Sequence, residues 1–362
     1  MRDLIDLRRI LTETRPSATA IALRILLRCL SLPYALAMVV RNKLYEFGIK
    51  RSYRSPLIVV SVGNLSVGGT GKSPAVAWLA KWFRRQGIRV AILSRGYGAL
   101  DSGQNDEALE LELQLPDVPH LQHVDRVASA IVAEAELDMQ VLILDDGFQH
   151  RRIQRDLDIV LLDATDARAI RWCLPGGVLR EPMGSLARAG VVMLTRCDQI
   201  DSADLEDQLG QIRRLAADAI LVHARHRPCS LLCYPNQQKP VDELRGLRVL
   251  AFCAIGNPGS FFATLRQLGA EILETRVWPD HHGFDATDVQ ALHNWVAENS
   301  QAQVIVCTVK DWVKLEVSRL GDVELWALAV EMDLVQGTAE LEESLQNLLA
   351  KLPDNQAGSS AR

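Results

Sequence analysis

The chain reads IVVSVGNLSVGGTGKSP over residues 58–74, and this stretch decides the expected fold. An apolar, β-branched run breaks into glycines, and a helix-like segment follows. This order is typical of a loop that binds nucleotide phosphates, because glycines let backbone N–H groups and a helix N-terminus face an anion. Lys72 adds a charge for the phosphates, and Ser73 offers a hydroxyl group to Mg²⁺. The predicted nucleotide-binding residues are Gly68, Gly69, Thr70, Gly71, Lys72 and Ser73.

The common form of this loop, G-x-x-x-x-G-K-[ST], has a glycine where this chain has Ser66. The alternative interpretation is a glycine-rich turn at a buried junction between a strand and a helix. Lys72 and Ser73 both fall at the positions that the loop requires, which favours phosphate binding over a plain turn.

The composition is that of a globular protein with an uneven charge distribution. Its 362 residues are 48% apolar, which allows a substantial core and two domains. Residues 1–56 contain 11 Lys or Arg against 4 acidic residues, a net charge of +7, so the rest of the chain carries −12 of the total of −5. This asymmetry argues against nucleic-acid binding and predicts an anionic surface near the N-terminal segment. The seven cysteines form no C-x-x-C pair and are expected to be reduced.

The segment 18–40 is apolar and carries scattered arginines. Its uncharged part, 29–40, contains Pro33 and is shorter than the roughly 20 residues needed to cross a bilayer, so no span is expected. Arg24 and Arg28 lie one helical turn apart among leucines and isoleucines, which suits a helix lying in the headgroup plane. The alternative is an amphipathic helix that packs on its own domain.

From residue 57 onward, segments of strand and helix character alternate. This alternation predicts a P-loop NTPase-like α/β fold, with a parallel sheet covered by helices on both faces. Ligands bind such sheets at the carboxyl ends of the strands, so the residues that follow each strand are the candidates for a site. The strand candidates are 57–62, 89–94, 140–144, 158–163, 190–195 and 219–223.

Charged residues follow several of these predicted strands. Asp145 and Asp146 end an apolar strand as a Walker B element does, and one of them would hold Mg²⁺. Arg95 follows the second strand, where it could meet a phosphate. Arg180 lies in a loop rich in Gly and Pro, a rigid setting suited to charge stabilisation in phosphoryl transfer. The alternatives are an ordinary turn at Arg95 and a surface connection at Arg180.

Together, these motifs resemble the tetraacyldisaccharide 4'-kinase family of lipid A biosynthesis. The resemblance extends in order over nearly all of residues 57 to about 330, and the combination is far more specific than any single motif. The basic apolar N-terminal segment also resembles the family's membrane-associating helix. The segments that carry the resemblance are 62–74, 94–98, 145–150, 174–181, 254–262, 280–282 and 308–314.

The resemblance implies ATP- and Mg²⁺-dependent phosphorylation of the 4'-hydroxyl group of a lipid-linked disaccharide. It implies a location at the cytoplasmic face of the inner membrane of a Gram-negative bacterium, where we expect a monomer that binds no nucleic acid. The family's proposed base lies in a Gly-Asp-Glu-Pro pattern that corresponds here to residues 105–108, so Asp106 inherits the role although both outer neighbours differ. Taken alone, Asp106 would be interpreted as a solvated acid in a polar loop. In the family's mechanism, it would accept or orient the hydroxyl proton with support from His281.

The resemblance and the strand ends together assign a set of site residues. The expected catalytic residues are Asp106, His281, Lys72 and Arg180. The expected substrate-binding residues are Asn64, Arg95, Arg126, Gln149, His150 and Glu181, and the expected Mg²⁺ ligands are Ser73, Asp145 and Asp146.

Four segments are expected along the chain. They are a basic amphipathic membrane-associating segment (1–56), a P-loop kinase core (57–222), a smaller α/β domain (223–352) and a flexible tail (353–362). His281 falls in the smaller domain, which predicts an active site in a cleft that closes on substrate. His281 and His282 could instead bind a metal, although no second ligand pair has suitable spacing.

Two rival functions fit parts of the pattern. A membrane-recruited P-loop GTPase switch would share the phosphate loop, and residues 195–198 read Thr-Arg-Cys-Asp where many GTPases carry Asn/Thr-Lys-x-Asp. Arg196 in place of lysine weakens this interpretation, which also leaves Asp106 and His281 without a purpose. A P-loop kinase for a soluble metabolite is the other rival, and the apolar N-terminal segment argues against it.

Overall fold

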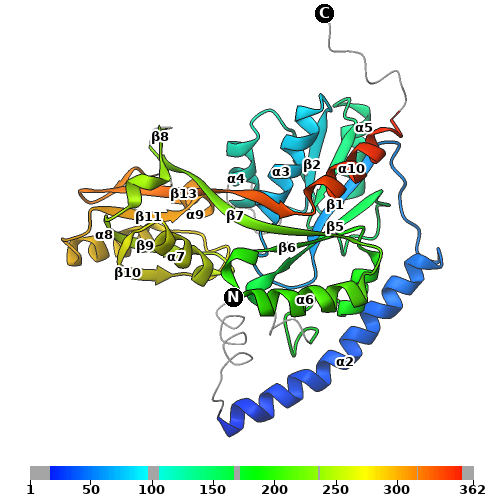
Figure 1. The fold of residues 1–362 in the computed structure, drawn as a ribbon, viewed down its shortest axis with the longest axis horizontal. Coiled ribbons are helices and arrows are strands. Elements are labelled where there is room, and N and C mark those ends of the chain that lie inside the picture. The colour runs from blue at the N-terminus through cyan, green and yellow to red at the C-terminus, as the bar shows by residue number, and fades with distance from the viewer. Residues whose placement is uncertain (1–16, 97–105, 167–171, 235–236, 316, 353–362) are drawn as a thin grey trace, which may run out of the picture. The chain divides into compact units, whose positions relative to one another are not determined.

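The computed structural model describes residues 17–96, 106–166, 172–234, 237–315 and 317–352, and the chain divides into two compact units (Figure 1). Unit 1 comprises Met1–Arg95, Leu115–Arg225 and Asp333–Arg362, and unit 2 comprises Gly96–Gln114 and His226–Met332. This division differs from the expected boundaries, because 96–114 belongs to unit 2 and 333–352 to unit 1. Tyr97, Gly98 and Asn105 of the quoted motifs, and the expected tail, lie outside the described residues.

Unit 1 is built on a parallel sheet with the strand order β3-β2-β4-β1-β5-β6-β7. Strands β1 and β4 are buried at every residue, as their largely apolar sequences predict. The strands are β1 (Ile58–Asn64), β2 (Val90–Ser94), β3 (His120–Gln122), β4 (Val141–Asp145), β5 (Leu157–Asp163), β6 (Val191–Thr195) and β7 (Ile220–Cys233). The helices are α2 (Ala18–Glu46), α3 (Lys72–Arg85), α5 (Arg126–Ala135), α6 (Ser202–Leu215) and α10 (Thr338–Leu349).

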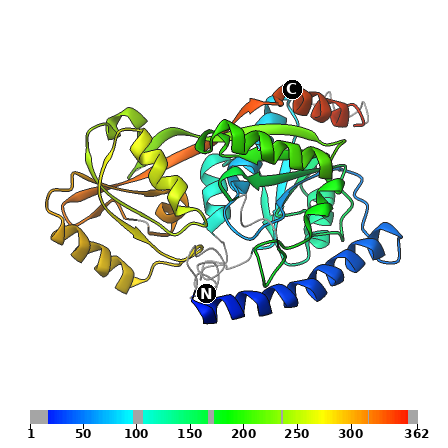
Figure 2. The same cartoon turned by 60° about the horizontal axis from the view of Figure 1, so that its bottom comes forward.

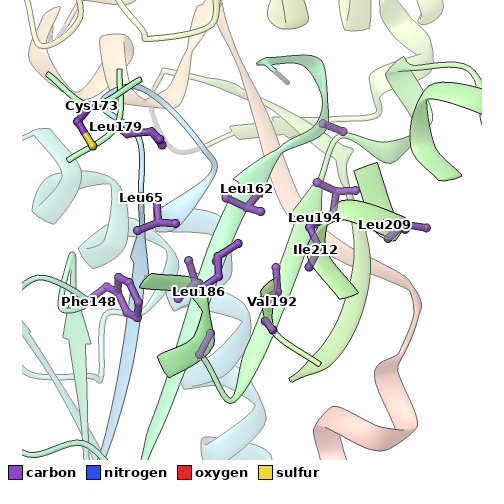
Figure 3. Close-up of a cluster of buried hydrophobic side chains, with 14 residues drawn as sticks. Leu65, Phe148, Leu162, Cys173, Leu179, Leu186, Val192, Leu194, Leu209 and Ile212 are labelled. Atoms are coloured by element: carbon purple, nitrogen blue, oxygen red, sulfur yellow. The ribbon is translucent and has the colours of Figure 1, made fainter. Parts of the chain in front are cut away.

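The direction of the strand order reverses at β1, and this reversal positions the site. Because crossovers between parallel strands are right-handed, α3 packs on one face of the sheet and α5 and α6 pack on the other. Figure 3 shows part of the apolar core on the α6 face, where Leu209 and Ile212 of α6 meet side chains of β5 and β6. In the register of β1 and β4, Val62 pairs with Asp145. The phosphate loop and the Asp145–Asp146 pair therefore leave the same edge of the sheet.

Helix α2 is a single helix of 29 residues that continues through Pro33 (Figure 2). Ser17 caps its N-terminus by accepting a hydrogen bond from the backbone of Ala20. By length and apolar composition it qualifies as a candidate membrane span, and 6% of its most apolar 18-residue stretch is buried. The expectation that the segment is too short to span considered only the uncharged part, whereas the helix extends beyond that part at both ends.

Unit 2 is a smaller α/β unit whose strands follow the order β10-β9-β11-β13, all parallel, and β7 and β13 each run through both units. Strand β10 was not predicted, because its sequence, Glu-Ile-Leu-Glu-Thr-Arg-Val, has neither regular alternation nor an apolar run, and none of its residues is fully buried. The strands are β8 (Gln237–Lys239), β9 (Arg248–Cys253), β10 (Glu271–Val277), β11 (Val304–Thr308), β12 (Arg319–Leu320) and β13 (Val323–Gln336). The helices are α4 (Asp106–Gln114), α7 (Pro258–Gln267), α8 (Ala286–Glu298) and α9 (Val309–Leu315).

The expectation that Asp106 lies in a polar loop is wrong. Asp106 is the first residue of α4, and it is 5% exposed. The segment after it is rich in Glu, Leu and Ala, which are strong helix formers, and a carboxylate in the first turn interacts favourably with the helix dipole.

Candidate active site

The phosphate loop has the backbone conformation that its glycines allow. Gly68 and Gly71 have φ values of 127° and 88°, which side chains disfavour, and Gly71 is the N-cap residue of α3. Lys72 and Ser73 are therefore the first two residues of the helix, where backbone N–H groups lack intrahelical partners. This geometry provides an anion site at the N-terminus of α3.

Three charged side chains meet beside the loop. Lys72 Nζ lies 3.7 Å from Asp146 Oδ1, and Arg180 Nη1 lies 2.9 Å and 2.7 Å from the two carboxylate oxygens of Asp146. Arg126 is buried and donates a hydrogen bond of 3.0 Å to the backbone carbonyl of Asp146. The structure thus brings together four residues that are far apart in the sequence.

Asp146 is held in an unusual state by these neighbours. Burial disfavours its charged form, but Lys72 and Arg180 outweigh burial and keep the pKa of this carboxyl group well below its usual range. Its backbone has φ of 52°, a left-handed conformation that non-glycine residues adopt at a cost of about 1 kcal/mol or more. Both features hold a charged carboxylate at the mouth of the anion site.

Several polar atoms near the loop have no hydrogen-bond partner within the described part of the chain. They belong to Asn64 (Oδ1), Thr70 (Oγ1), Gln149 (Oε1) and His150 (Nε2), and all four are buried. Asn64 and Gln149 are joined by a hydrogen bond of 2.9 Å from Gln149 Nε2 to the Asn64 carbonyl. Burial, with help from Arg126, lowers the pKa of His150 to about 4, so its ring is neutral.

These atoms, the glycine cradle and the local charges fit a nucleoside triphosphate with Mg²⁺. Ser73 and Asp145 are buried close to the N-terminus of α3 and the end of β4, and they supply the hard oxygen ligands that Mg²⁺ prefers. Within the described residues, no cluster of three or more His, Cys, Asp or Glu has metal-binding geometry. Mg²⁺ held by one or two carboxylates and by substrate phosphates does not need such a cluster.

Two expected substrate-binding residues differ sharply in exposure. Arg95 is exposed at the end of β2, where a ligand can reach it. Glu181 is fully buried, and it accepts hydrogen bonds from Asn42 of α2 at 2.7 Å and from Arg188 at 3.0 Å. In this structure the Glu181 carboxylate therefore contacts α2 and Arg188.

Helix α2 is bonded along one side to the loops of this site. Ser31 Oγ donates to the Cys173 carbonyl at 2.8 Å, and Tyr34 donates to the Arg180 carbonyl at 2.9 Å. Gly176 is required for this approach, because a Cβ atom there would lie 2.7 Å from the Arg28 Cα. The helix thus fixes the loop that presents Arg180.

Sequence reasoning missed the support of the phosphate loop by β6. Arg196 is buried, forms an ion pair with Asp163 and donates a hydrogen bond of 3.0 Å to the Gly69 carbonyl. Thr195 Oγ1 donates to the Thr70 carbonyl at 3.0 Å. Both residues belong to the 195–198 motif, which was considered only for guanine recognition.

A second group of charged residues lies in unit 2. His281 Nδ1 lies 3.0 Å from Asp106 Oδ1, and the two residues are 175 positions apart in the sequence. Lys310 Nζ lies 3.6 Å from Asp106 Oδ2 and 3.3 Å from Asp280 Oδ1. His281, with φ of 61°, is another of the non-glycine residues in the left-handed region.

The charges of this group are strongly coupled. Burial disfavours ionisation of Asp106, but the hydrogen bond from His281 and the ammonium group of Lys310 hold its pKa well below the usual range. The hydrogen bond to Asp106 raises the pKa of His281, while burial and Lys310 oppose the rise. Asp106 is therefore a permanent carboxylate, and a proton that reaches this pair resides on His281.

His282 does not join His281 at a common site. Its Nε2 atom lies 2.7 Å from Asp288 Oδ2, in the first turn of α8. Sequence reasoning also gave no role to Lys310 and Lys314, although their spacing of four residues on a helix was a signal that both face one partner.

Comparisons with known proteins bear on the whole chain. The family model described as tetraacyldisaccharide-1-P 4'-kinase matches residues 23–350. Curated proteins named tetraacyldisaccharide 4'-kinase include one from Anaeromyxobacter sp. (strain Fw109-5), 39% identical over 86% of this chain and 88% of the relative. Another, from Pelobacter propionicus, is 36% identical over 95% of this chain and 98% of the relative.

A solved structure agrees with these relatives. LpxK from Aquifex aeolicus, crystallised in complex with ATP, is 30% identical, with a TM-score of 0.70 over 90% of this chain and 99% of that one. Matches of this extent in sequence and in fold establish the family. The chain belongs to the tetraacyldisaccharide-1-P 4'-kinase family.

Proposed function

We propose that this protein transfers the γ-phosphoryl group of ATP to the 4'-hydroxyl group of a tetraacyldisaccharide 1-phosphate, in the biosynthesis of lipid A. The observation that carries the proposal is the meeting of Lys72, Arg180 and Asp146 at the N-terminus of α3, in a chain that belongs to the 4'-kinase family. The structure of the Aquifex aeolicus relative in complex with ATP supports the choice of nucleotide.

In unit 1, the donor phosphates would be held by the backbone of Gly68 to Ser73 and by Lys72. Mg²⁺, coordinated by Ser73 and by Asp145 or Asp146, would neutralise charge on the β- and γ-phosphates when bound. Arg180 is 26% exposed on its side chain and is already oriented by Asp146, so it is suited to stabilising the charge that develops on the transferred group. Arg126 orients Asp146 through its backbone carbonyl.

In unit 2, Asp106 and His281 would receive the proton of the acceptor hydroxyl group. Asp106 faces His281 Nδ1, which fixes the ring so that Nε2, 3.5 Å from Lys310 Nζ, is the nitrogen that can accept the proton, and the His281 side chain is 41% exposed. Because cations hold Asp106 ionised, it is a weak base, and its main effect is to orient and stabilise the His281 imidazolium. Transfer then requires the acceptor group of unit 2 to meet the nucleotide site of unit 1, and we propose closure on substrate as that step.

We further propose that α2 lies in the plane of an anionic membrane surface. Polar residues of α2 from Ser31 to Asn42 are hydrogen-bonded to the loop that contains Cys173 and Glu181, so this half of the helix cannot cross a bilayer without carrying the rest of unit 1 with it. Its other side exposes apolar side chains, which are Ile21, Ile25, Leu26, Leu30, Leu32, Leu36, Val39 and Val40. An arrangement with one polar, bound side and one apolar, exposed side suits an interfacial helix.

The end of α2 adds a second apolar and basic element. Phe47 and Ile49 are 75% and 68% exposed in the turn that follows the helix. The ring of Tyr45 lies within 5.8 Å of the cationic groups of Arg41, Lys50 and Arg151. Cations beside exposed apolar residues fit lipid phosphates at the level of the headgroups. We place the protein, as a monomer that binds no nucleic acid, at the cytoplasmic face of the inner membrane, because ATP is available there.

The GTPase alternative finds no support in the geometry of its motif. The guanidinium group of Arg196 is buried against Asp163 and the phosphate loop, where it supports Gly69. The Asp106–His281 group also has no purpose in a GTPase switch.

The deciding experiment uses the purified full chain with γ-labelled ATP, Mg²⁺ and detergent-dispersed tetraacyldisaccharide 1-phosphate. We expect label in the lipid, dependent on Mg²⁺, with GTP a poor donor. Label released only as inorganic phosphate, with GTP preferred, would support the GTPase instead. Phosphorylation of water-soluble sugars at a comparable rate would support the soluble-metabolite kinase.

A further inference from the structure

Two buried lysines of α9 face the acceptor group of unit 2. Lys310 and Lys314 lie one helical turn apart, and their side chains are 13% and 2% exposed. Moving an ammonium group out of water is costly unless a carboxylate compensates for the lost hydration. Asp106 on α4 compensates both, because its Oδ2 atom lies 3.6 Å from Lys310 Nζ and 3.5 Å from Lys314 Nζ.

The two lysines differ in their other contacts. Lys314 Nζ donates a hydrogen bond of 2.9 Å to the His282 carbonyl and lies 3.2 Å from Asp311 Oδ1, so it ties α9 to the loop after β10. Lys310 Nζ lies 3.5 Å from His281 Nε2. Lys310 therefore faces the nitrogen that Asp106 leaves free.

The charges around His281 pull its protonation in opposite directions. Asp106 and Asp280 favour the imidazolium form, and Lys310 opposes it. Glu110, in the next turn of α4, is buried, and burial raises its pKa to about 7, so it adds only part of a negative charge near neutral pH. The titratable groups around His281 in the described part of unit 2 are Asp106, Glu107 and Glu110 of α4, Asp280 and His282 of its own loop, Asp288 of α8, and Lys310, Asp311 and Lys314 of α9.

We propose that Lys310 is a positioning residue for phosphoryl transfer: its ammonium group beside Nε2 disfavours protonation of His281, so that the Nε2 electron pair stays unprotonated until the acceptor hydroxyl group takes the place of the ammonium group. The proposal rests on the function proposed above. A histidine surrounded only by carboxylates would already carry a proton at neutral pH and could not act as a base. The positive charge of Lys310 offsets the effect of these carboxylates at Nε2, the ring nitrogen that must stay unprotonated.

The test compares the pH dependence of kcat for Lys310→Met, Lys310→Arg and the wild-type protein. The acidic limb is the part of the profile where kcat rises with pH as His281 loses its proton. Loss of the cation 3.5 Å from Nε2 should raise the pKa of His281 and so move this limb to higher pH by about one unit or more. Lys310→Met should then lose about tenfold or more on the acidic limb and recover at high pH, with KM for ATP unchanged. Lys310→Arg retains the charge and should keep the limb in place. Lys239→Met, at a surface ion pair of unit 2 with Glu324, is the matched control.

A second variant gives the opposite sign. Asp280→Asn removes a carboxylate that favours the imidazolium, and the Asp280 side chain is 28% exposed, so the fold should tolerate the change. The acidic limb should move to lower pH. An unmoved limb in both Lys310→Met and Asp280→Asn, or equal losses at every pH, would overturn the proposal.

A measurement without substrate separates this proposal from the kinase assignment. NMR titration of ¹³C-labelled histidines, with His281 identified by its absence in His281→Gln, reports the protonation of His281 directly. Its midpoint should rise in Lys310→Met and fall in Asp280→Asn even if the lipid is not the acceptor. Unchanged midpoints in an enzyme that phosphorylates the lipid would refute the role of Lys310 alone.

Discussion

Replacing Asp106 by Asn and His281 by Gln tests the acceptor group as one unit. The two side chains share a 3.0 Å hydrogen bond between a buried carboxylate and an imidazole, and such charged hydrogen bonds contribute about 1.5–3 kcal/mol. Removal of a positioned base typically lowers a rate by ~10² or more, which is about 2.7 kcal/mol at 1.36 kcal/mol per tenfold. The two magnitudes agree, so each single variant should lower kcat for lipid phosphorylation by about 10².

The double variant carries the sharper expectation. If Asp106 acts only through His281, the pair loses its effect once, and Asp106→Asn/His281→Gln should be little slower than the slower single variant. Independent action would give a loss of about 10⁴, the product of the two single losses. The kinetic coupling would then amount to about 2.7 kcal/mol for one unit and to about zero for independent residues.

The assay measures label transfer from γ-labelled ATP to detergent-dispersed lipid at saturating substrates. KM for ATP should change little, because both residues lie in unit 2 and the phosphate loop lies in unit 1. Asp242→Asn, an exposed carboxylate of unit 2, is the matched control, and melting temperatures check the fold of each variant. A fully active Asp106→Asn enzyme would mean that the altered 105–108 motif has been misaligned, and multiplicative losses would refute the single unit.

Three further outcomes are expected. Lys72→Ala should abolish nearly all transfer while the fold persists, because its ammonium group serves the phosphates; near-normal turnover of the folded variant, compared with Lys81→Ala, would contradict the phosphate-loop assignment. Vesicle binding in a sedimentation assay should rise with anionic lipid and fall with salt, since each cation near the surface contributes about 1 kcal/mol. Replacing Phe47 by Ser should weaken vesicle binding. Retention of the protein on membranes after an alkaline wash would indicate a membrane span instead. The pKa of Asp146 is held below its usual range, so the folded protein binds fewer protons than the unfolded chain as the pH falls through about 4. Asp146 therefore stabilises the fold above that pH, and this contribution is lost below it. The free energy of unfolding, measured with urea, should fall less between pH 6 and pH 3 in Asp146→Asn than in the wild-type protein. An equal fall in both proteins would contradict this origin.

The sequence alone predicted the local backbone structure around the proposed nucleotide site. The phosphate loop and the Asp145–Asp146 pair are local patterns, in which a strand, a turn and the next helix follow within about a dozen residues. Glycines with positive φ and an apolar run that must be buried leave few alternative conformations, so the pattern and the structure agree. The six strands predicted in unit 1 match the observed bounds within two residues, except that β7 runs on to Cys233, and the short strand β3 was not predicted.

The structure of α4 and the role of α2 did not follow from pattern. Asp106 begins a helix, and the sequence signal for that start, Asn105 followed by two acidic residues, was passed over. The burial of Asp106 depends on α9, about 200 positions later, and no local pattern shows it. The contacts of Ser31, Tyr34 and Asn42 depend on loops more than 100 residues away. A sequence pattern shows that a helix has a polar side, but it does not show which loop that side will bind.

What the sequence by itself determined is therefore the chemistry that rests on neighbouring residues: a phosphate loop, a pair of carboxylates at a strand end and an apolar basic helix. Only the tertiary structure decided the charge states of the site residues, because these depend on distances between side chains that are far apart in the sequence. Asp106, His281 and Lys310 span more than 200 positions, and the pKa shifts of Asp106 and His281 arise only because the three side chains stand within 4 Å of one another. Electrostatic interactions of this strength fall off within a few ångströms and grow with burial, so they are properties of the fold and not of the motif.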